Sequence, residues 1–280
     1  RSETIRPLDE NAMESARLHW DAIAKPLHSL GRLEDMIVQL AGICENPVLA
    51  PRKKAVLIFC ADNGIVAEGV TQTTQDVTAA VTQNFAKGIA SVNALSRICG
   101  TEVFPVDIGV AQALDCPGVL NRKVAFGTQN FAHGPAMRRD EAEQAVCTGI
   151  DLVQEKAAEG YNLIVTGEMG IGNTTTSSAV FSVLQGLPPE QVTGRGAGLS
   201  DAGLQHKIQV ISRAVAALQP DPGDVLDVLS KVGGFDVCGM MGAFLGGAIC
   251  RVPVLVDGFI SAVAANCAVR LCPACRDYIF

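Results

Sequence analysis

The segment Gly167-Glu-Met-Gly-Ile-Gly-Asn-Thr-Thr175 places glycines, hydroxyls and one acid directly after an apolar run. Its glycines allow the backbone to approach a ligand closely. Asn173 is predicted to cap the helix that follows, and the free N–H groups of that helix, with the Thr174 and Thr175 hydroxyls, would bind an anion. The spacing matches neither the G-x-G-x-x-G fingerprint nor a P-loop, because no Gly-Lys-Ser/Thr follows. The segment therefore predicts an anion site of another kind.

Glu168 is the exception in this segment, because a carboxylate beside an anion site would repel the anion. We expect Glu168 to serve another group, such as a ring N–H of a substrate. The alternative is structural, since an acid in the first turn of a helix interacts favourably with the helix dipole.

A second glycine cluster, Thr193-Gly-Arg-Gly-Ala-Gly-Leu-Ser200, has almost no side chains at its centre. It suits the second wall of a phosphate pocket, and Ser200 or Asp201 is expected to cap the next helix. Lys207, about two turns into that helix, could reach a phosphate as a point charge. On spacing alone, an ordinary exposed lysine is the favoured interpretation of Lys207.

Other polar residues also follow predicted strands, where ligands bind in open α/β sheets. Asp62 and Asp257 could each hold a ribose hydroxyl or order a turn. The segment 71–75 offers further hydroxyls. The segment Gly233-Gly-Phe-Asp236 starts a glycine-rich helix, and a ligand role and a role in helix packing are equally expected for Asp236.

The elements that must position these residues alternate between strands and helices. Residues 55–62 form an apolar run ending in Asp-Asn-Gly, typical of a buried parallel strand before a tight turn. Pro105 makes its strand an edge candidate. The irregular segment 111–138 is long enough to be functional. Strands are predicted at 55–62, 101–109, 162–166 and 252–257, and helices at 10–24, 29–43, 76–87, 90–99, 140–159, 173–185, 200–218, 224–231, 236–249 and 259–271.

This alternation predicts an α/β fold: a Rossmann-like, mostly parallel sheet with helices on both faces. The all-helical N-terminal part, residues 1–50, is predicted to form a small helical subdomain, and residues 51–280 to form the Rossmann-like domain.

Composition disfavours several classes of protein, namely those that bind nucleic acid, span a membrane or hold a metal. The net charge is −7 and Lys and Arg are not clustered, so nucleic acid is not an expected partner. No apolar stretch has the length of a membrane span. The ten cysteines suggest core packing in a reduced, cytoplasmic protein. Cys272 and Cys275 form a C-x-x-C without a second ligand pair, so we expect no metal, and no cofactor is expected.

Several long motifs, in one order along essentially the whole chain, resemble the nicotinate-nucleotide–dimethylbenzimidazole phosphoribosyltransferase family. The matching segments are 25–34, 60–65 with 68–70, 134–137, 167–175, 229–236 and 253–259. The resemblance implies a Rossmann-like sheet, a helical subdomain built from both chain ends, and a homodimer. It also implies the reaction: a benzimidazole-type base attacks the anomeric carbon of nicotinate mononucleotide, nicotinate leaves, and an α-ribazole phosphate forms.

The resemblance implies roles for individual residues. By position in the motifs, Glu168 would hold a ring nitrogen of the base, with Thr73 and Met169 beside the base. The donor phosphate and ribose would be bound by Gly170, Asn173, Thr174, Gly194, Gly196, Gly198 and Lys207. The 51–280 domain would then bind both nucleotide and base.

Members of this family continue beyond the position of Phe280 with a motif whose Glu is taken as the general base. The resemblance therefore predicts that the chain lacks its C-terminal segment, that no catalytic residue can be assigned within it, and that turnover is impaired. General-base assistance commonly contributes about 10²–10⁴-fold to a rate.

Three alternatives remain at this stage. A paralogous transferase that activates phenols would share the donor site, but a phenol has no second ring nitrogen for Glu168. A catalytically silent form would only bind the nucleotide. A nicotinamide-dependent oxidoreductase is disfavoured because the G-x-G-x-x-G fingerprint is missing after the first strand.

Overall fold

A computed structural model describes residues 5–48 and 53–280 and contains a five-stranded sheet of order β3-β2-β1-β4-β5. All four strand pairings are parallel. The strands are β1 (Lys54–Ala61), β2 (Thr101–Gly109), β3 (Leu120–Asn121), β4 (Leu163–Met169) and β5 (Val254–Leu255). The α/β prediction with a Rossmann-like parallel sheet is confirmed.

Helices connect the strands in nearly every case, as parallel pairing requires. Most lie within two or three residues of the predicted positions. They are α1 (Glu10–Ala22), α2 (Arg32–Cys44), η2 (Gly64–Glu68), α3 (Asp76–Ala86), α4 (Ser91–Cys99), α5 (Arg139–Ala158), α6 (Asn173–Gln185), α7 (Pro189–Val192), α8 (Asp201–Leu218), α9 (Val225–Val232), α10 (Phe235–Cys250), α11 (Phe259–Leu271) and η3 (Pro273–Tyr278).

The central strands β1 and β4 bring two sequence motifs to one edge of the sheet. Every residue of β1 after Lys54 is buried, which explains its continuous apolar run. In the parallel register, Phe59 pairs with Glu168 and Cys60 with Met169. The Asp-Asn-Gly turn after β1 and the glycine-rich turn after β4 are therefore neighbours.

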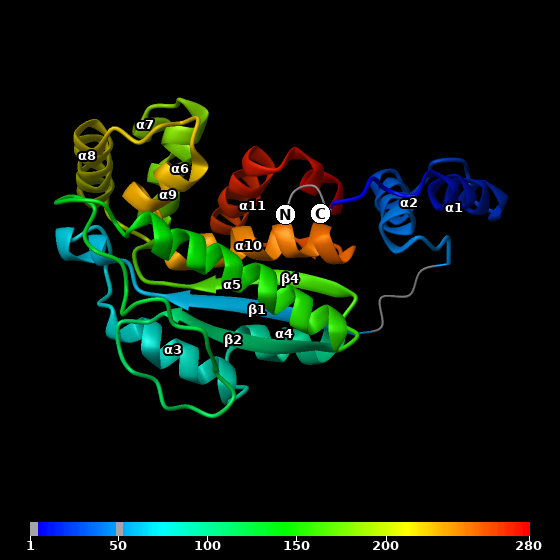
Figure 1. The fold of residues 1–280 in the computed structure, drawn as a ribbon, viewed down its shortest axis with the longest axis horizontal. Helices are drawn as coiled ribbons and strands as arrows, with labels where there is room; N and C mark the ends of the chain where they lie inside the picture. The colour runs from blue at the N-terminus through cyan, green and yellow to red at the C-terminus, as the bar shows by residue number, and fades with distance from the viewer. Residues whose placement is uncertain (1–4, 49–52) are drawn as a thin grey trace.

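Helices cover both faces of the sheet (Figure 1). On one face α10 lies against β1, β2 and β4, and α5 packs on α10. On the other face α3 and α4 lie against β2. The α5–α10 crossing depends on glycine: a Cβ on Gly149 would lie 2.0 Å from the Gly239 oxygen, and one on Gly242 would lie 2.0 Å from the Val146 oxygen.

We expect Gly149→Ala to lower the free energy of unfolding by ~3 kcal/mol, because backbone atoms on α10 cannot yield to the new methyl group. Urea denaturation followed by circular dichroism measures this. Gly134→Ala is the control, since nothing lies within 4 Å of its Cβ position. Equal midpoints for both variants would contradict the tight crossing.

Three local predictions are wrong. Strand β2 is not at the edge, because β3 pairs with its Val106 and Asp107, beyond Pro105. Asp140 does not cap α5; the helix begins at Arg139, and Glu141 accepts the Arg138 backbone N–H at 2.8 Å. The last strand is only two residues long, and its Val254 also forms a parallel bridge with Ile279 near the chain end.

The helices α1 and α2 form a hairpin at one end of the molecule, beside η3 and the chain terminus (Figure 1). A small apolar cluster of Ala16, Val38 and Ala41 holds the hairpin together. The Arg251 guanidinium, at the end of α10, donates to the backbone oxygens of Gly42 and Ile43 at 2.6 and 3.0 Å. These contacts fasten the hairpin to the sheet-containing part.

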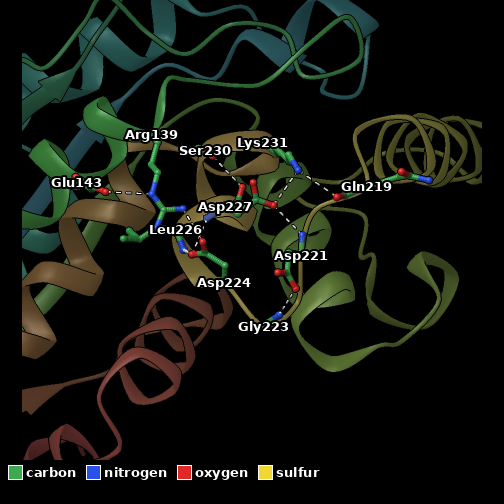
Figure 2. Close-up of polar contacts among 10 residues, drawn as sticks. All are labelled: Arg139, Glu143, Gln219, Asp221, Gly223, Asp224, Leu226, Asp227, Ser230 and Lys231. Carbon is green, nitrogen blue, oxygen red and sulfur yellow. Dashed lines mark hydrogen bonds and ion pairs between the residues drawn. The ribbon is translucent and has the colours of Figure 1, made fainter.

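Charged residues fix α9 against α5 (Figure 2). Asp224 caps α9 by accepting the backbone N–H groups of Leu226 and Asp227, and its other oxygen accepts from Arg139 on α5 at 2.6 Å. Lys231 pairs with Asp227 at 2.9 Å one turn later. Because α9 runs directly into the glycines before α10, this anchoring places Asp236 at the carboxyl edge of the sheet.

Candidate active site

The turn from β4 into α6 forms the centre of the site, and its glycines are required by close backbone contacts. A Cβ on Gly170 would lie 2.4 Å from the Ala61 oxygen at the end of β1. Gly172 precedes α6 with φ of 93°, a conformation that favours glycine. Two polar side chains, Glu168 before the turn and Asn173 after it, are thereby brought together.

Asn173 does not cap α6, contrary to the prediction. It is the first residue of the helix, and Gly172 occupies the cap position. Its buried side-chain amide instead donates one hydrogen bond to Glu168 Oε2 and another, of 2.9 Å, to Asp236 Oδ2. The amide therefore connects β4 with the start of α10.

Both carboxyl groups that Asn173 contacts have raised pKa values. Burial raises the pKa of Glu168 to about 7, and the nearby charge of Asp236 contributes to this rise. Burial raises the pKa of Asp236 to about 6. A carboxyl with a pKa near neutrality can accept or donate a proton at physiological pH, which is the property of a general acid or base.

Lys207 is buried, so the favoured interpretation of an exposed lysine is wrong. Only 1% of its surface is exposed, and burial lowers its pKa to about 8. Its Nζ donates to Thr174 Oγ1 at 2.8 Å and to the Gly194 oxygen at 3.2 Å. A buried cation whose partners are neutral oxygens can bind an anion strongly.

The two ends of the glycine cluster 193–200 contact different side chains, Lys207 and Gln72. A Cβ on Gly196 would lie 2.9 Å from Thr174 Oγ1 and 3.6 Å from Lys207 Nζ, so Gly194 and Gly196 both border the lysine. Gly198 lies farther along, where its oxygen accepts from Gln72 at 2.6 Å. Arg195 forms an ion pair with Asp201 and donates a hydrogen bond to the Leu199 backbone oxygen. Ser200 caps α8 by accepting the Gly203 backbone N–H.

Glu168 also borders an apolar cavity of about 190 Å³. Most of its wall is aliphatic or aromatic, with Glu168 and Asp257 as its two carboxylates. The lining residues are Val56, Ile58, Phe85, Val92, Val165, Thr166, Gly167, Glu168 and Asp257. Sequence reasoning missed Phe85 and Val92, because only the packing of α3 and α4 on the sheet reveals which of their residues face β4.

Two predicted base-binding residues do not line this cavity. Met169 packs beside it in the apolar cluster around Val56, Ile58 and Cys60. Thr73 is exposed on the loop between η2 and α3, where its backbone N–H donates to Thr71 Oγ1. Within residues 5–48 and 53–280, no three His, Cys, Asp or Glu side chains are grouped to hold a metal. No helix in these ranges is long and apolar enough to cross a membrane.

The geometry thus contains an apolar pocket with a carboxyl of raised pKa and, beyond Asn173, a buried cation. A family model described as "Phosphoribosyltransferase" matches residues 5–280. This chain belongs to that family.

Individual relatives agree with this membership of the phosphoribosyltransferases. The nicotinate-nucleotide–dimethylbenzimidazole phosphoribosyltransferase of Acetivibrio thermocellus is 50% identical, over 99% of this chain and 79% of the relative. The enzyme of that name from Roseiflexus sp. is 47% identical over 99% and 80%. The crystal structure of CobT from Thermus thermophilus has a TM-score of 0.92 and 39% identity, covering 96% of this chain and 81% of that one.

The relatives are matched over about four fifths of their own length, and this does not show that the chain lacks a segment. The expectation of a missing C-terminal segment, and that of impaired turnover, are therefore not borne out. The dinucleotide-dependent oxidoreductase alternative is removed by the family membership.

Proposed function

We propose that this phosphoribosyltransferase transfers ribose phosphate from nicotinate mononucleotide to dimethylbenzimidazole, giving α-ribazole 5′-phosphate and nicotinate. This reaction activates the lower ligand of a cobamide. The observation that carries the proposal is the presence of a carboxyl that borders the cavity and of a buried lysine bonded to neutral oxygens, on either side of the Gly170–Asn173 turn. The names of the relatives agree with these substrates.

Lys207 supplies the charge for the donor phosphate in this proposal. Its ammonium, with Thr174 and the backbone around Gly170, Gly194 and Gly196, forms the phosphate site, and Asn173 lies between this site and the cavity. Gly198 joins the same loop to Gln72 and helps to close it over the nucleotide. One monophosphate needs only one strong point charge in a site that excludes water.

Glu168 holds the base in this proposal by accepting a hydrogen bond from its ring N–H. A neutral benzimidazole has one ring nitrogen with a lone pair and one that carries hydrogen. The lone-pair nitrogen forms the new bond to the anomeric carbon, while the bond from that carbon to the nicotinate nitrogen breaks and its electron pair stays with nicotinate. The second ring nitrogen, held by the Glu168 carboxylate, then loses its proton to the general base, which family members carry in the motif beyond the position of Phe280. Met169 and Thr73 are proposed to complete the mouth of the base site.

Gly167 lines the cavity that receives the base, and the absence of a side chain there leaves room for the base. A Cβ on Gly167 would lie 3.3 Å from Ile58 Cγ1, inside a cavity of about 190 Å³. We therefore expect Gly167→Ala to raise the KM for dimethylbenzimidazole about ten-fold and to leave the KM for nicotinate mononucleotide unchanged. Steady-state kinetics with each substrate varied measures this. A rise in the nucleotide KM alone would show that the base binds elsewhere.

The direct test of the function is an assay of the full chain with both substrates. Nicotinate release and α-ribazole phosphate are followed by chromatography. Equal amounts of the two products are expected. A preference for a phenol over dimethylbenzimidazole would support the phenol-activating alternative. Binding of nicotinate mononucleotide without any product would support the silent, nucleotide-binding alternative.

We further propose that the enzyme is a cytoplasmic homodimer with residues 1–50 as a helical subdomain and 51–280 as the catalytic domain. The α1–α2 hairpin exposes several leucines, among them Leu18, Leu27 and Leu33, which suits a surface covered by a second copy. All ten cysteines are free, as in a reducing compartment. Sedimentation equilibrium tests the dimer.

A further inference from the structure

No buried side chain holds the first residues of α8, which lead to Lys207. The helix begins at Asp201, but its apolar packing begins only at Ile208, and none of the residues 201–206 is buried. Burial lowers the pKa of Lys207, so its charge opposes folding and does not itself hold this end of the helix in place. Contacts outside the core are therefore needed to keep the lysine beside Thr174.

An exposed histidine connects this end of the helix to η2. The Nε2 atom of His206 lies 2.6 Å from the backbone oxygen of Glu68, which is 138 residues away along the chain. A carbonyl oxygen only accepts hydrogen bonds, so Nε2 must carry a hydrogen and donate it. On the same edge, Gln72 donates to the Gly198 oxygen at 2.6 Å. Both contacts join the wall formed by residues 193–207 to the segment that follows β1.

Glu68, which receives this hydrogen bond, is itself fixed by a loop that enters the core. Its Oε1 accepts from Asn130 Nδ2 at 2.6 Å, and His133 Nε2 lies 3.1 Å from the same oxygen. Between these two residues of the loop, Phe131 is buried in the main apolar cluster. A continuous series of contacts thus runs from the core through Asn130 and Glu68 to His206.

We propose that His206 is a positioning residue, which holds the start of α8 on the Glu68 backbone oxygen and thereby keeps Lys207 at the donor-phosphate site. The inference rests on the proposed function and adds a residue to its machinery. His206 does not touch the phosphate; it fixes the helical turn from which Lys207 extends. Because its partner is a backbone oxygen, any side chain that places an N–H at the position of Nε2 should replace it.

Three substitutions of His206 test this role. The amide nitrogen of glutamine can take the place of histidine Nε2, whereas the side chain of asparagine is too short to reach it. His206→Ala and His206→Asn should therefore raise the KM for nicotinate mononucleotide about five-fold, the usual effect of one lost hydrogen bond, and His206→Gln should leave it close to that of the parent. The kcat at saturating substrates and the KM for dimethylbenzimidazole should not change, because Lys207 still reaches the phosphate once it is bound.

Stability measurements distinguish this role from damage to the fold. Alanine has the highest helix propensity, which offsets the lost contact, so His206→Ala should unfold at nearly the same urea concentration as the parent. Gln205→Ala, which changes an exposed residue on the same turn, is the matched control and should leave both KM values in place. An unchanged nucleotide KM in His206→Ala, or equal losses in His206→Ala and His206→Gln, would overturn the proposal.

Titration of Lys207 without substrate separates this inference from the proposed function. Its side-chain NMR signal is identified by its loss in Lys207→Met. In His206→Ala the pKa of Lys207 should rise from about 8 toward the ordinary value of 10.5, because the ammonium can reach water, and in His206→Gln it should stay near 8. If no α-ribazole phosphate forms but the pKa moves as described, the positioning contact stands and the assigned reaction fails. If product forms but neither the pKa nor the nucleotide KM moves in His206→Ala, the reaction stands and the role of His206 fails.

Discussion

Glu168→Gln is expected to lower kcat/KM for dimethylbenzimidazole by about 10²–10³-fold, because it removes the charge that stabilises the ring N–H as the base becomes positive in the transition state. The amide has nearly the same shape as the carboxyl, so the cavity and the contact with Asn173 are largely kept. It lacks the negative charge of the carboxylate. The KM for nicotinate mononucleotide should stay close to that of the parent enzyme, because Lys207 lies beyond Asn173. Steady-state kinetics measure both parameters.

The pH profile gives an independent expectation for Glu168. Only its carboxylate form stabilises the positive ring N–H, and burial raises its pKa to about 7. The kcat/KM of the parent enzyme should therefore rise from pH 5 to about pH 7.5 and then fall as Lys207, whose pKa is about 8, loses its charge, and the rising limb should disappear in Glu168→Gln. Glu143→Gln, which changes a half-exposed carboxylate on α5, is the control. Full activity of Glu168→Gln would show that Glu168 does not hold the base.

Glu168 should also affect how stability depends on pH. Its pKa is higher in the folded chain than the ordinary value of 4.5, so the folded state binds more protons between about pH 4.5 and 7. The free energy of unfolding therefore falls as pH rises through that interval. Glu168→Gln should reduce this slope in urea denaturation at several pH values.

Lys207→Met is expected to weaken the binding of nicotinate mononucleotide by about 10²–10³-fold, as for removal of one partner of a buried charge pair. Methionine fills a similar volume without the charge. No carboxylate pairs with Lys207 among the residues that the structure describes. The phosphate of the donor is therefore the expected counter-charge. Isothermal titration calorimetry measures the affinity.

Although nucleotide binding should weaken in Lys207→Met, the free energy of unfolding of the free enzyme should not fall. Burial lowers the pKa of Lys207 to about 8, so a charged ammonium at pH 7 disfavours folding of the free enzyme. The free energy of unfolding rises with pH between about 8 and 10.5, because the unfolded chain then binds more protons. Lys207→Met should be at least as stable as the parent at pH 7 and should lose this slope.

An exposed lysine provides the matched control for Lys207. Lys87→Met removes a charge at the end of α3 and should change neither nucleotide affinity nor stability appreciably. Unchanged affinity in Lys207→Met would contradict the phosphate site. A strong loss of stability at pH 7 would instead show that the lysine has a structural role.

The sequence alone determined the order of the elements and the segments that meet at the carboxyl edge of the sheet. Continuous apolar runs such as 55–61 are explained by burial on both faces, and their alternation with helical segments requires parallel pairing. Turns rich in glycine after these strands marked Glu168 and the 193–200 loop as neighbours of a ligand. These signals are local, so they can be read without knowing the contacts.

Only the tertiary structure decided which of these residues are buried, which side chains contact one another, and how their pKa values change. Lys207 resembles a surface lysine in its helix, and only the packing of α8 against α6 buries it and lowers its pKa. Asp236 lies 63 residues from Asn173 along the chain, yet the two side chains are in contact. Phe85 and Val92 become cavity walls only when α3 and α4 pack on the sheet. Burial, charge proximity and shape depend on contacts between distant segments, and no local pattern carries them.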